Sequence, residues 1–146
     1  MLKKLNNIGD SAIVCDFGKN VNQSINREVI RLFYYIKKQV NLGNLKGILN
    51  CIPSYNKLII NFDLKIPNTK KVYDFINSAD FSNLNINQDK KEWSIPICYD
   101  LEMDLLNMSK ELKIDKDEKI NIHSKTSFFI YMIGFVPGHP FMGDLD

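Results

Sequence analysis

The chain has 146 residues, enough for one ordinary domain or two small ones, and its hydrophobic content of 45% and charged content of 25% are typical of a globular protein. A formal net charge of +2 is too small to indicate a polyanionic partner, and only Arg27 and Arg31 among the 19 basic residues are arginines, so we expect no nucleic-acid binding. Residues 1–20 contain no apolar signal core, which predicts a cytoplasmic protein without a membrane anchor.

The first forty residues predict a hairpin followed by a helix. Residues 2–8 and 11–17 read as short strands on either side of a Gly9-Asp10 turn. Asn22 or Ser24 can then cap a helix that ends at residues 41–43. Its apolar face has helical spacing and consists of Ile25, Val29, Leu32, Phe33, Ile36 and Val40.

A second hairpin and helix repeat this order. Residues 47–52 and 57–63 flank a turn-rich link, and the second of them alternates apolar and polar positions. After Pro67, Asn68 or Thr69 can cap a helix that turns Val72, Phe75, Ile76 and Ala79 inward. The ββαββα order predicts that residues 1–81 form a two-layer α+β domain, a four-stranded antiparallel sheet with both helices on one face. Its expected core contains Leu32, Phe33, Ile36, Leu58, Ile60 and Phe62.

Residues 82–146 do not supply all the elements that a second complete domain would need. Residues 82–92 are polar and aperiodic and predict a linker, and residues 93–99 predict a strand. A helical stripe follows at Leu101, Leu105, Met108 and Leu112, and Asp115 with Glu118 fits the cap of a short helix that ends near His123. Residues 128–136 are almost wholly apolar and predict a strand buried on both faces. Such a strand needs neighbours on both edges, so we expect this chain to be the front part of something longer, loosely ordered after residue 81.

The three cysteines predict no metal centre. Cys15, Cys51 and Cys98 are odd in number, have no metal-ligand spacing and each lie in an apolar, strand-like run. We therefore expect buried, reduced thiols, with a redox or ligand role as the less favoured alternative.

Several short motifs resemble the carboxyltransferase-type family that includes the B subunit of 5-oxoprolinase, allophanate hydrolase subunit 1 and the kinase inhibitor KipI. They are Gly9-Asp10-Ser11-Ala12, Asn26-x-x-Val29, Pro53-Ser54-Tyr55-x-x-Leu58, His123-Ser124, Tyr131, Gly134-Phe135-x-Pro137-Gly138 and Pro140-Phe141-Met142-Gly143. The resemblance covers the whole chain but only the first part of the family's length, and it implies that residues 93–146 are the incomplete start of a cyclophilin-like β-barrel. The chain departs from the family pattern at residues 100–105, at His139, where another aromatic is usual, and at Phe141, where tyrosine is usual.

The resemblance implies one component of a larger enzyme rather than an independent enzyme. In 5-oxoprolinase, the A, B and C subunits together couple ATP hydrolysis to opening 5-oxoproline to glutamate, so ATP would act at the level of the complex and not bind this chain alone. Related domains of urea-degrading enzymes transfer a carboxyl group to urea. The alternative is a KipI-like protein that binds and inhibits a sensor histidine kinase, and the fold does not decide between them.

Candidate functional residues concentrate near the end of the chain. The sequence has no G-x-S-x-G elbow and no glycine-rich phosphate loop, so catalytic residues stay unassigned and no metal is expected. We predict a substrate or partner surface made of His123, Tyr131, Gly134, Phe135, Pro137, Gly138 and His139. A structural role is the competing interpretation: the glycines and proline can simply turn the chain, His123 can stabilise a helix end, and His139 can be an exposed turn residue.

Overall fold

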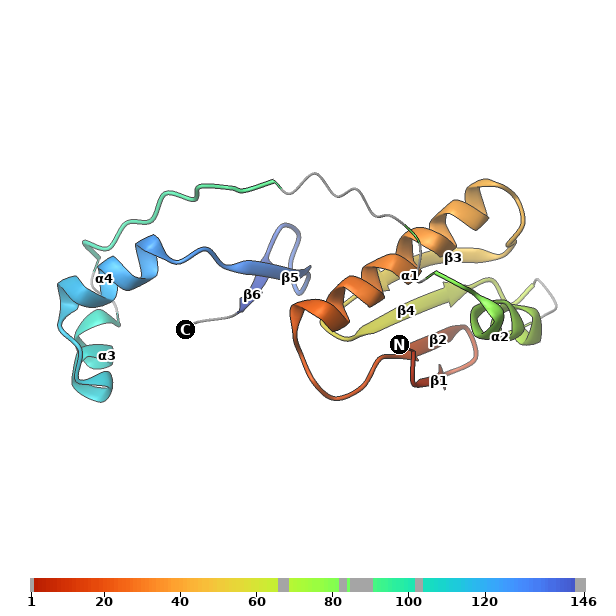
Figure 1. Cartoon of the computed structure of the whole chain (residues 1–146), viewed down its shortest axis with the longest axis horizontal. Helices are drawn as coiled ribbons and strands as arrows, with labels where there is room; N and C mark the ends of the chain where they lie inside the picture. Colours follow the sequence, from red (N-terminus) through yellow and green to blue (C-terminus); the bar gives the residue numbers. More distant parts are fainter. Residues whose placement is uncertain (1, 66–68, 82–83, 85–90, 102–103, 144–146) are drawn as a thin grey trace. The chain divides into compact units, whose positions relative to one another are not determined.

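The computed structural model describes residues 2–65, 69–81, 84, 91–101 and 104–143. The chain divides into two compact units, one of residues 1–87 together with 129–143 and one built on residues 88–128 (Figure 1). The domain borders expected at residues 81 and 93 stay predictions, and most of the expected linker, 82–92, lies outside the described residues.

The first unit is built on a four-stranded antiparallel sheet in the order β1-β2-β4-β3 (Figure 1). The strands are β1 (Lys4–Ile8), β2 (Ala12–Asp16), β3 (Ile48–Pro53) and β4 (Lys57–Phe62). In β4 every second residue is buried, because one face of the sheet is covered and the other is not. The predicted α+β class and antiparallel sheet are confirmed.

Two helices complete this unit, α1 (Gln23–Asn41) and α2 (Thr69–Ser78). Asn22 is the cap of α1, and its side-chain oxygen accepts a hydrogen bond of 2.9 Å from the Ile25 amide. Asn68, the alternative cap of α2, lies outside the described residues. The predicted core is confirmed: Leu32, Ile36, Leu58, Ile60 and Phe62 are buried in one cluster with Val72 and Ile76, and Phe33 packs against it.

The three cysteines, all expected to be buried, differ in how exposed their side chains are. Cys15 lies in the core, where burial, with a smaller contribution from Cys51, raises the pKa of its thiol to about 12. Burial also raises the pKa of the Cys51 thiol to about 11. Cys98 is exposed, so the prediction that it is buried is wrong. Its neighbours explain this difference, because residues 93–99 form no strand that could carry Cys98 into a core.

The second unit contains α3 (Leu105–Leu112) and α4 (Lys116–Lys125). Asp115 is confirmed as the cap residue of this helix, since its side chain accepts a hydrogen bond of 3.1 Å from the Asp117 amide. The part expected of Glu118 stays a prediction. The strand predicted at residues 93–99 is wrong, since Trp93 is 69% exposed and no second strand pairs with this stretch among the described residues. The helix predicted from Leu101 begins only at Leu105.

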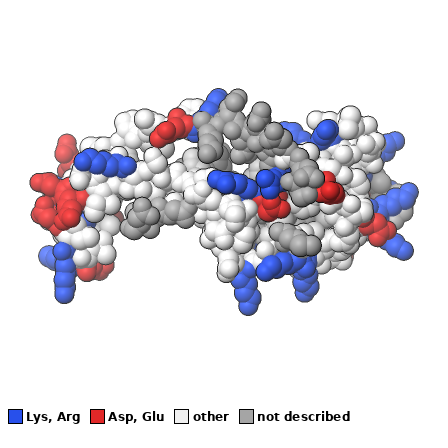
Figure 2. All heavy atoms as spheres, in the orientation of Figure 1, with Lys and Arg blue, Asp and Glu red and all other residues white. Residues whose placement is uncertain are grey.

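A buried lysine, rather than an apolar cluster, joins these two helices. The Lys119 side chain lies between them, and its Nζ donates to the Leu105 carbonyl oxygen at 2.7 Å and to Ser109 Oγ. Leu101, Met108 and Leu112, three of the four residues expected to form an apolar stripe, are exposed. Figure 2 shows acidic side chains gathered over α3 and α4, whereas Lys and Arg side chains are scattered over the visible face.

The last described element is a hairpin of β5 (Phe129–Ile133) and β6 (Pro140–Gly143), which belongs to the first unit. The prediction of a strand buried on both faces is wrong: of the five residues of β5, Tyr131 is the buried one, and Ile133 is 63% exposed. A two-stranded hairpin has one packed face, which explains the difference. The barrel implied by the family resemblance stays a prediction. Among the described residues, no helix is long and apolar enough to cross a bilayer.

Candidate functional site

A buried asparagine joins three distant segments of the first unit. Asn26 is 2% exposed, and its Nδ2 lies 3.1 Å from the carbonyl oxygens of Ser54, Tyr55 and Tyr131. A side-chain amide nitrogen carries two hydrogens, so at least one of them is shared between two acceptors. Because unpaired buried carbonyls are costly, this one side chain stabilises the contact between α1, the β3–β4 turn and β5.

The backbone of β5 is shaped to meet Asn26. Pairing between β5 and β6 shifts register between Ile130 and Met132, which places the irregularity at Tyr131. Such bulges bend a strand and re-aim its groups, here the Tyr131 carbonyl oxygen toward Asn26. Gly143 lies beside the Tyr131 ring, and a Cβ at this glycine would come within 3.0 Å of Tyr131 Cε2. A larger residue would therefore push the ring away from β6.

Aromatic side chains continue the junction outward along the hairpin. The Tyr55 ring packs on Tyr131 and Phe141, with ring centroids 5.6 Å and 6.1 Å apart. His139 follows at 5.1 Å from Phe141, and Phe135 at 6.5 Å from His139. This aromatic row runs from the Asn26 junction to the loop between β5 and β6, and edge-to-face contacts of this kind stabilise their arrangement. Tyr55 thus joins the β3–β4 turn to the hairpin through ring contacts.

The loop of residues 134–139 consists of two successive tight turns. The Val136 amide donates to the Gly134 carbonyl at 2.8 Å, which closes a three-residue turn around Phe135 at φ 66°. The His139 amide donates to the Val136 carbonyl at 3.2 Å, and Gly138 takes the positive φ of 79° that this Pro-Gly turn requires. The prediction that Pro137-Gly138 turns the chain out of the strand is confirmed.

Phe135 is the unusual residue of this loop. A bulky residue at positive φ costs on the order of 1–3 kcal/mol, and its side chain is 92% exposed, so the ring gains little burial in return. Strain of this kind persists where the surrounding structure imposes it and is often associated with function.

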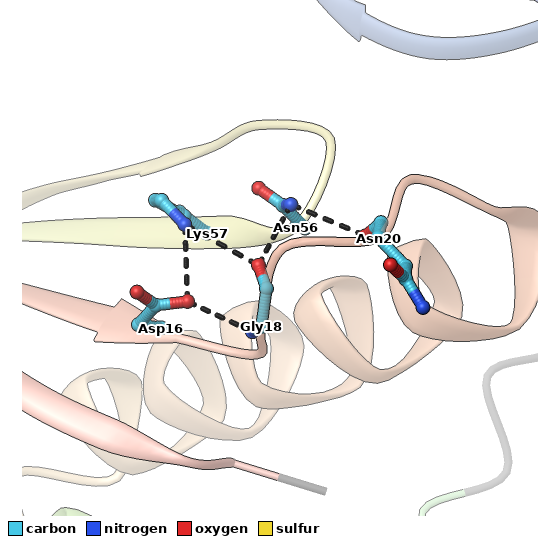
Figure 3. Close-up of polar contacts among 5 residues, drawn as sticks. All are labelled: Asp16, Gly18, Asn20, Asn56 and Lys57. Carbon is cyan, nitrogen blue, oxygen red and sulfur yellow. Dashed lines mark hydrogen bonds and ion pairs between the residues drawn. The ribbon is translucent and has the colours of Figure 1, made fainter.

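A network of polar contacts stabilises the loop between β2 and α1 (Figure 3). Asp16 Oδ1 accepts from the Gly18 amide at 2.8 Å and from Lys57 Nζ at 3.0 Å. Asn56 Nδ2 donates to the Gly18 carbonyl at 2.9 Å and to the Asn20 carbonyl at 3.2 Å. The Gly18 hydrogen bond, followed by Lys57, lowers the pKa of the Asp16 carboxyl below its usual range. The network joins the β2–α1 loop to the β3–β4 turn, the same turn that Asn26 contacts.

His123 lies in the second unit, so it is described apart from the loop. Its Nδ1 is 2.7 Å from Tyr99 Oη, and its ring also packs on Phe128. His123 occupies the last turn of α4, as the helix-end interpretation requires, and it is exposed. A substrate- or partner-binding role for His123 stays a prediction.

The structure brings together six of the seven predicted surface residues. They are Tyr131, Gly134, Phe135, Pro137, Gly138 and His139, all on the β5–β6 hairpin. The predicted surface omitted Asn26, Ser54 and Phe141, although each lies in a motif that the sequence shares with the family. Among the described residues, no group of three or more histidine, cysteine or acidic residues could hold a metal ion.

Residues 3–146 match the family described as carboxyltransferase domain, subdomain C and D. The chain belongs to this family. It is 28% identical to the 5-oxoprolinase B subunit of Bacillus subtilis, over 97% of this chain and 63% of that protein. Identity to the 5-oxoprolinase B subunit of Haemophilus influenzae is 21%, over 94% of this chain and 62% of that protein. The chain therefore spans somewhat less than two thirds of the length of these relatives.

A solved structure shares the fold of this carboxyltransferase-domain chain. The crystal structure of TTHA0988 superposes with a TM-score of 0.73 and 20% identity, over 92% of this chain and 25% of that chain. The family motifs fall on both sides of the Asn26 junction, in α1, the β3–β4 turn and the β5–β6 hairpin. The junction thus accounts physically for motif positions that are up to 105 residues apart.

Proposed function

We propose that the chain acts as the B component of a multi-subunit, ATP-dependent 5-oxoprolinase, which opens 5-oxoproline to glutamate. The observation that carries this proposal is the identity of 28% to the Bacillus subtilis protein over 97% of this chain. A second relative of the same name supports it. The proposal includes a cytoplasmic location, where both ATP and the product glutamate are available.

We further propose that the chain contributes a surface and not a complete active site. The loop of residues 134–139 offers few side-chain polar groups that could hold a charged substrate, since His139 is its one ionisable residue. ATP would be used by the complex, with the A and C subunits as partners. An allophanate- or urea-type activity is the neighbouring possibility within the same family.

Reconstitution tests this proposal. The chain is purified alone and together with the candidate A and C subunits of the same genome, and 5-oxoproline-dependent ATP hydrolysis and glutamate formation are measured. We expect turnover only when all three subunits are present. Turnover by the chain alone, or an equally active pair of A and C without it, would contradict the proposal.

The same preparation distinguishes the competing functions. Activity with urea or allophanate in place of 5-oxoproline would assign the chain to the related carboxyltransferase or hydrolase branch of the family. If no substrate is turned over and the chain instead inhibits autophosphorylation of a sensor histidine kinase, the KipI-like alternative replaces the enzyme. The position of the gene beside partner-subunit genes or beside a kinase gene is the simplest first observation.

A further inference from the structure

The contacts between the β5–β6 hairpin and the rest of the first unit form a small, well-defined docking site. Asn26 Nδ2 lies 3.1 Å from the Tyr131 carbonyl oxygen. Ser54 Oγ donates to Met132 Sδ at 3.2 Å, and the Tyr55 ring packs on the Tyr131 ring with centroids 5.6 Å apart. Each of these contacts is non-covalent and joins a hairpin residue to α1 or to the β3–β4 turn. The same contacts can therefore form whichever copy of the chain supplies the hairpin.

The docking site selects a particular kind of strand. Tyr131 is the buried residue of β5, and it lies at the register shift between Ile130 and Met132. Its ring and its carbonyl oxygen occupy the site together, the ring on Tyr55 and the oxygen on Asn26. A ligand for this site must therefore present a bulged strand with an aromatic residue at the bulge. Residues 129–143 of a second copy meet this requirement because their sequence is identical.

A long segment connects the hairpin to the remainder of the first unit. Phe81 is buried in the core of that unit, and the hairpin begins at Phe129. The residues between them include α3 and α4, which are joined through Lys119. At about 3.3 Å per extended residue, such a connection is long enough to reach a neighbouring molecule with both helices folded. The effective concentration of a tethered group is about millimolar for a short tether and falls as the tether lengthens, so a second copy can compete at high protein concentration.

We propose that the surface formed by Asn26, Ser54 and Tyr55 binds the β5–β6 hairpin of a second copy of this chain, so that two copies exchange hairpins. An exchanged hairpin makes the contacts that it makes within one chain, and no new complementary surface is needed. Exchange in both directions closes a symmetric dimer. This inference concerns the first unit alone and does not depend on the proposed enzymatic function.

A mixture of two full-length variants tests the exchange. Asn26→Asp replaces the amide donor by an acceptor of the same size, which disrupts the docking site and leaves the hairpin sequence unchanged. Tyr131→Ala removes the ring that occupies the site and leaves the docking site unchanged. The mixture alone offers an intact site and an intact hairpin, on different chains. At about 100 μM we expect each variant to be monomeric and the mixture to form a one-to-one dimer, with masses measured by light scattering.

Arg27→Ala is the matched control, because it changes the exposed neighbouring position of α1 and leaves its own hairpin docked. Mixed with Tyr131→Ala, it should give at least roughly tenfold less dimer than Asn26→Asp does. Hydrogen exchange checks that Asn26→Asp releases the hairpin, since the β5 amides should then exchange faster while those of β2 and β4 stay slow. If the β2 and β4 amides also exchange fast, Asn26→Ala takes its place, because it removes the donor without adding a charge.

Three outcomes would overturn hairpin exchange. The first is a mixture that stays monomeric although the β5 amides of the Asn26 variant are released. The second is a β5 strand as protected in the Asn26 variant as in the unchanged chain, because the hairpin would then not be held by this site. The third is equal dimerisation of the Asn26 variant by itself, which would place the contact between copies elsewhere on the chain.

Discussion

The two units of the chain are stabilised in different ways. The first unit has a core of buried side chains on two strands, β2 and β4, and two helices, including Leu32, Ile36 and Leu58. The second has α3 and α4 joined through the buried Lys119, with Leu106 and Leu112 exposed. Apolar burial drives folding at about 25 cal/mol per Å², so the first unit should be the stable one. The β5–β6 hairpin, although it follows the second unit in sequence, shares the stability of the first.

The largest expected effect distinguishes the apolar core of the first unit from the α3–α4 pair of the second. Leu32→Ala in α1 removes a side chain of zero exposure and should lower the free energy of unfolding by about 3 kcal/mol. Leu112→Ala in α3, at 55% exposure, should cost less than about 0.5 kcal/mol. Urea unfolding followed by circular dichroism measures both. Equal losses would mean that the second unit has an apolar core of its own.

The next effect tests what attaches the hairpin. Asn26→Ala leaves the buried carbonyl of Tyr131 and the partly buried carbonyls of Ser54 and Tyr55 without their shared donor and should cost about 2 kcal/mol. Arg27→Ala, at the exposed neighbouring position of α1, is the control and should change the same unfolding curve little. If the two variants were equally stable, the Asn26 junction would have no energetic role.

A smaller effect concerns the loop that the hairpin carries. Gly138→Ala places a Cβ at φ 79° and should cost about 1 kcal/mol in thermal unfolding. Gly134→Ala is the matched control, because the added Cβ meets the flexible end of Met132, at 2.8 Å from its Cε. We expect the smaller loss at Gly134, and the reverse order would contradict the turn geometry described.

The smallest effect is the pH dependence of the Asp16 network. The Gly18 amide and Lys57 lower the folded-state pKa of Asp16, so the carboxylate stabilises the fold at pH values above its unfolded pKa. This contribution is lost as the pH falls below about 4 and through the folded pKa. A partly exposed ion pair of this kind contributes on the order of 0.2–1 kcal/mol. Asp16→Asn should therefore lower stability at pH 7 and flatten its decline in acid, and an unchanged acid profile would contradict the network.

The sequence predicted the first unit well because its signals are local. Alternating burial in β4 and helical spacing in α1 each bury one face, so the pattern of apolar residues is enough to place them. The caps at Asn22 and Asp115 were also predictable, since each contacts an amide two or three residues ahead.

The second unit and the hairpin were predicted less well for a physical reason. Residues 93–99 have the composition of a strand, yet a strand forms only where another backbone pairs with it. The apolar run at residues 128–136 suggested burial on both faces, whereas its hairpin packs through Tyr131 and exposes Phe135. The contact that attaches it, Asn26 to Tyr131, spans 105 residues and leaves no periodic signal. Both residues lie in family motifs, but the motifs do not indicate that the two residues are in contact.

Hydrogen exchange at the backbone amides of β5 tests most directly whether Asn26 holds the hairpin in the first unit. We expect the amides of residues 129–133 that pair with β6 to be protected in the intact chain. In Asn26→Ala they should exchange roughly tenfold faster or more, while amides in β2 and β4 stay slow. Fast exchange of β5 in the unchanged chain, or equal protection in the variant, would show that the hairpin is not held by this junction.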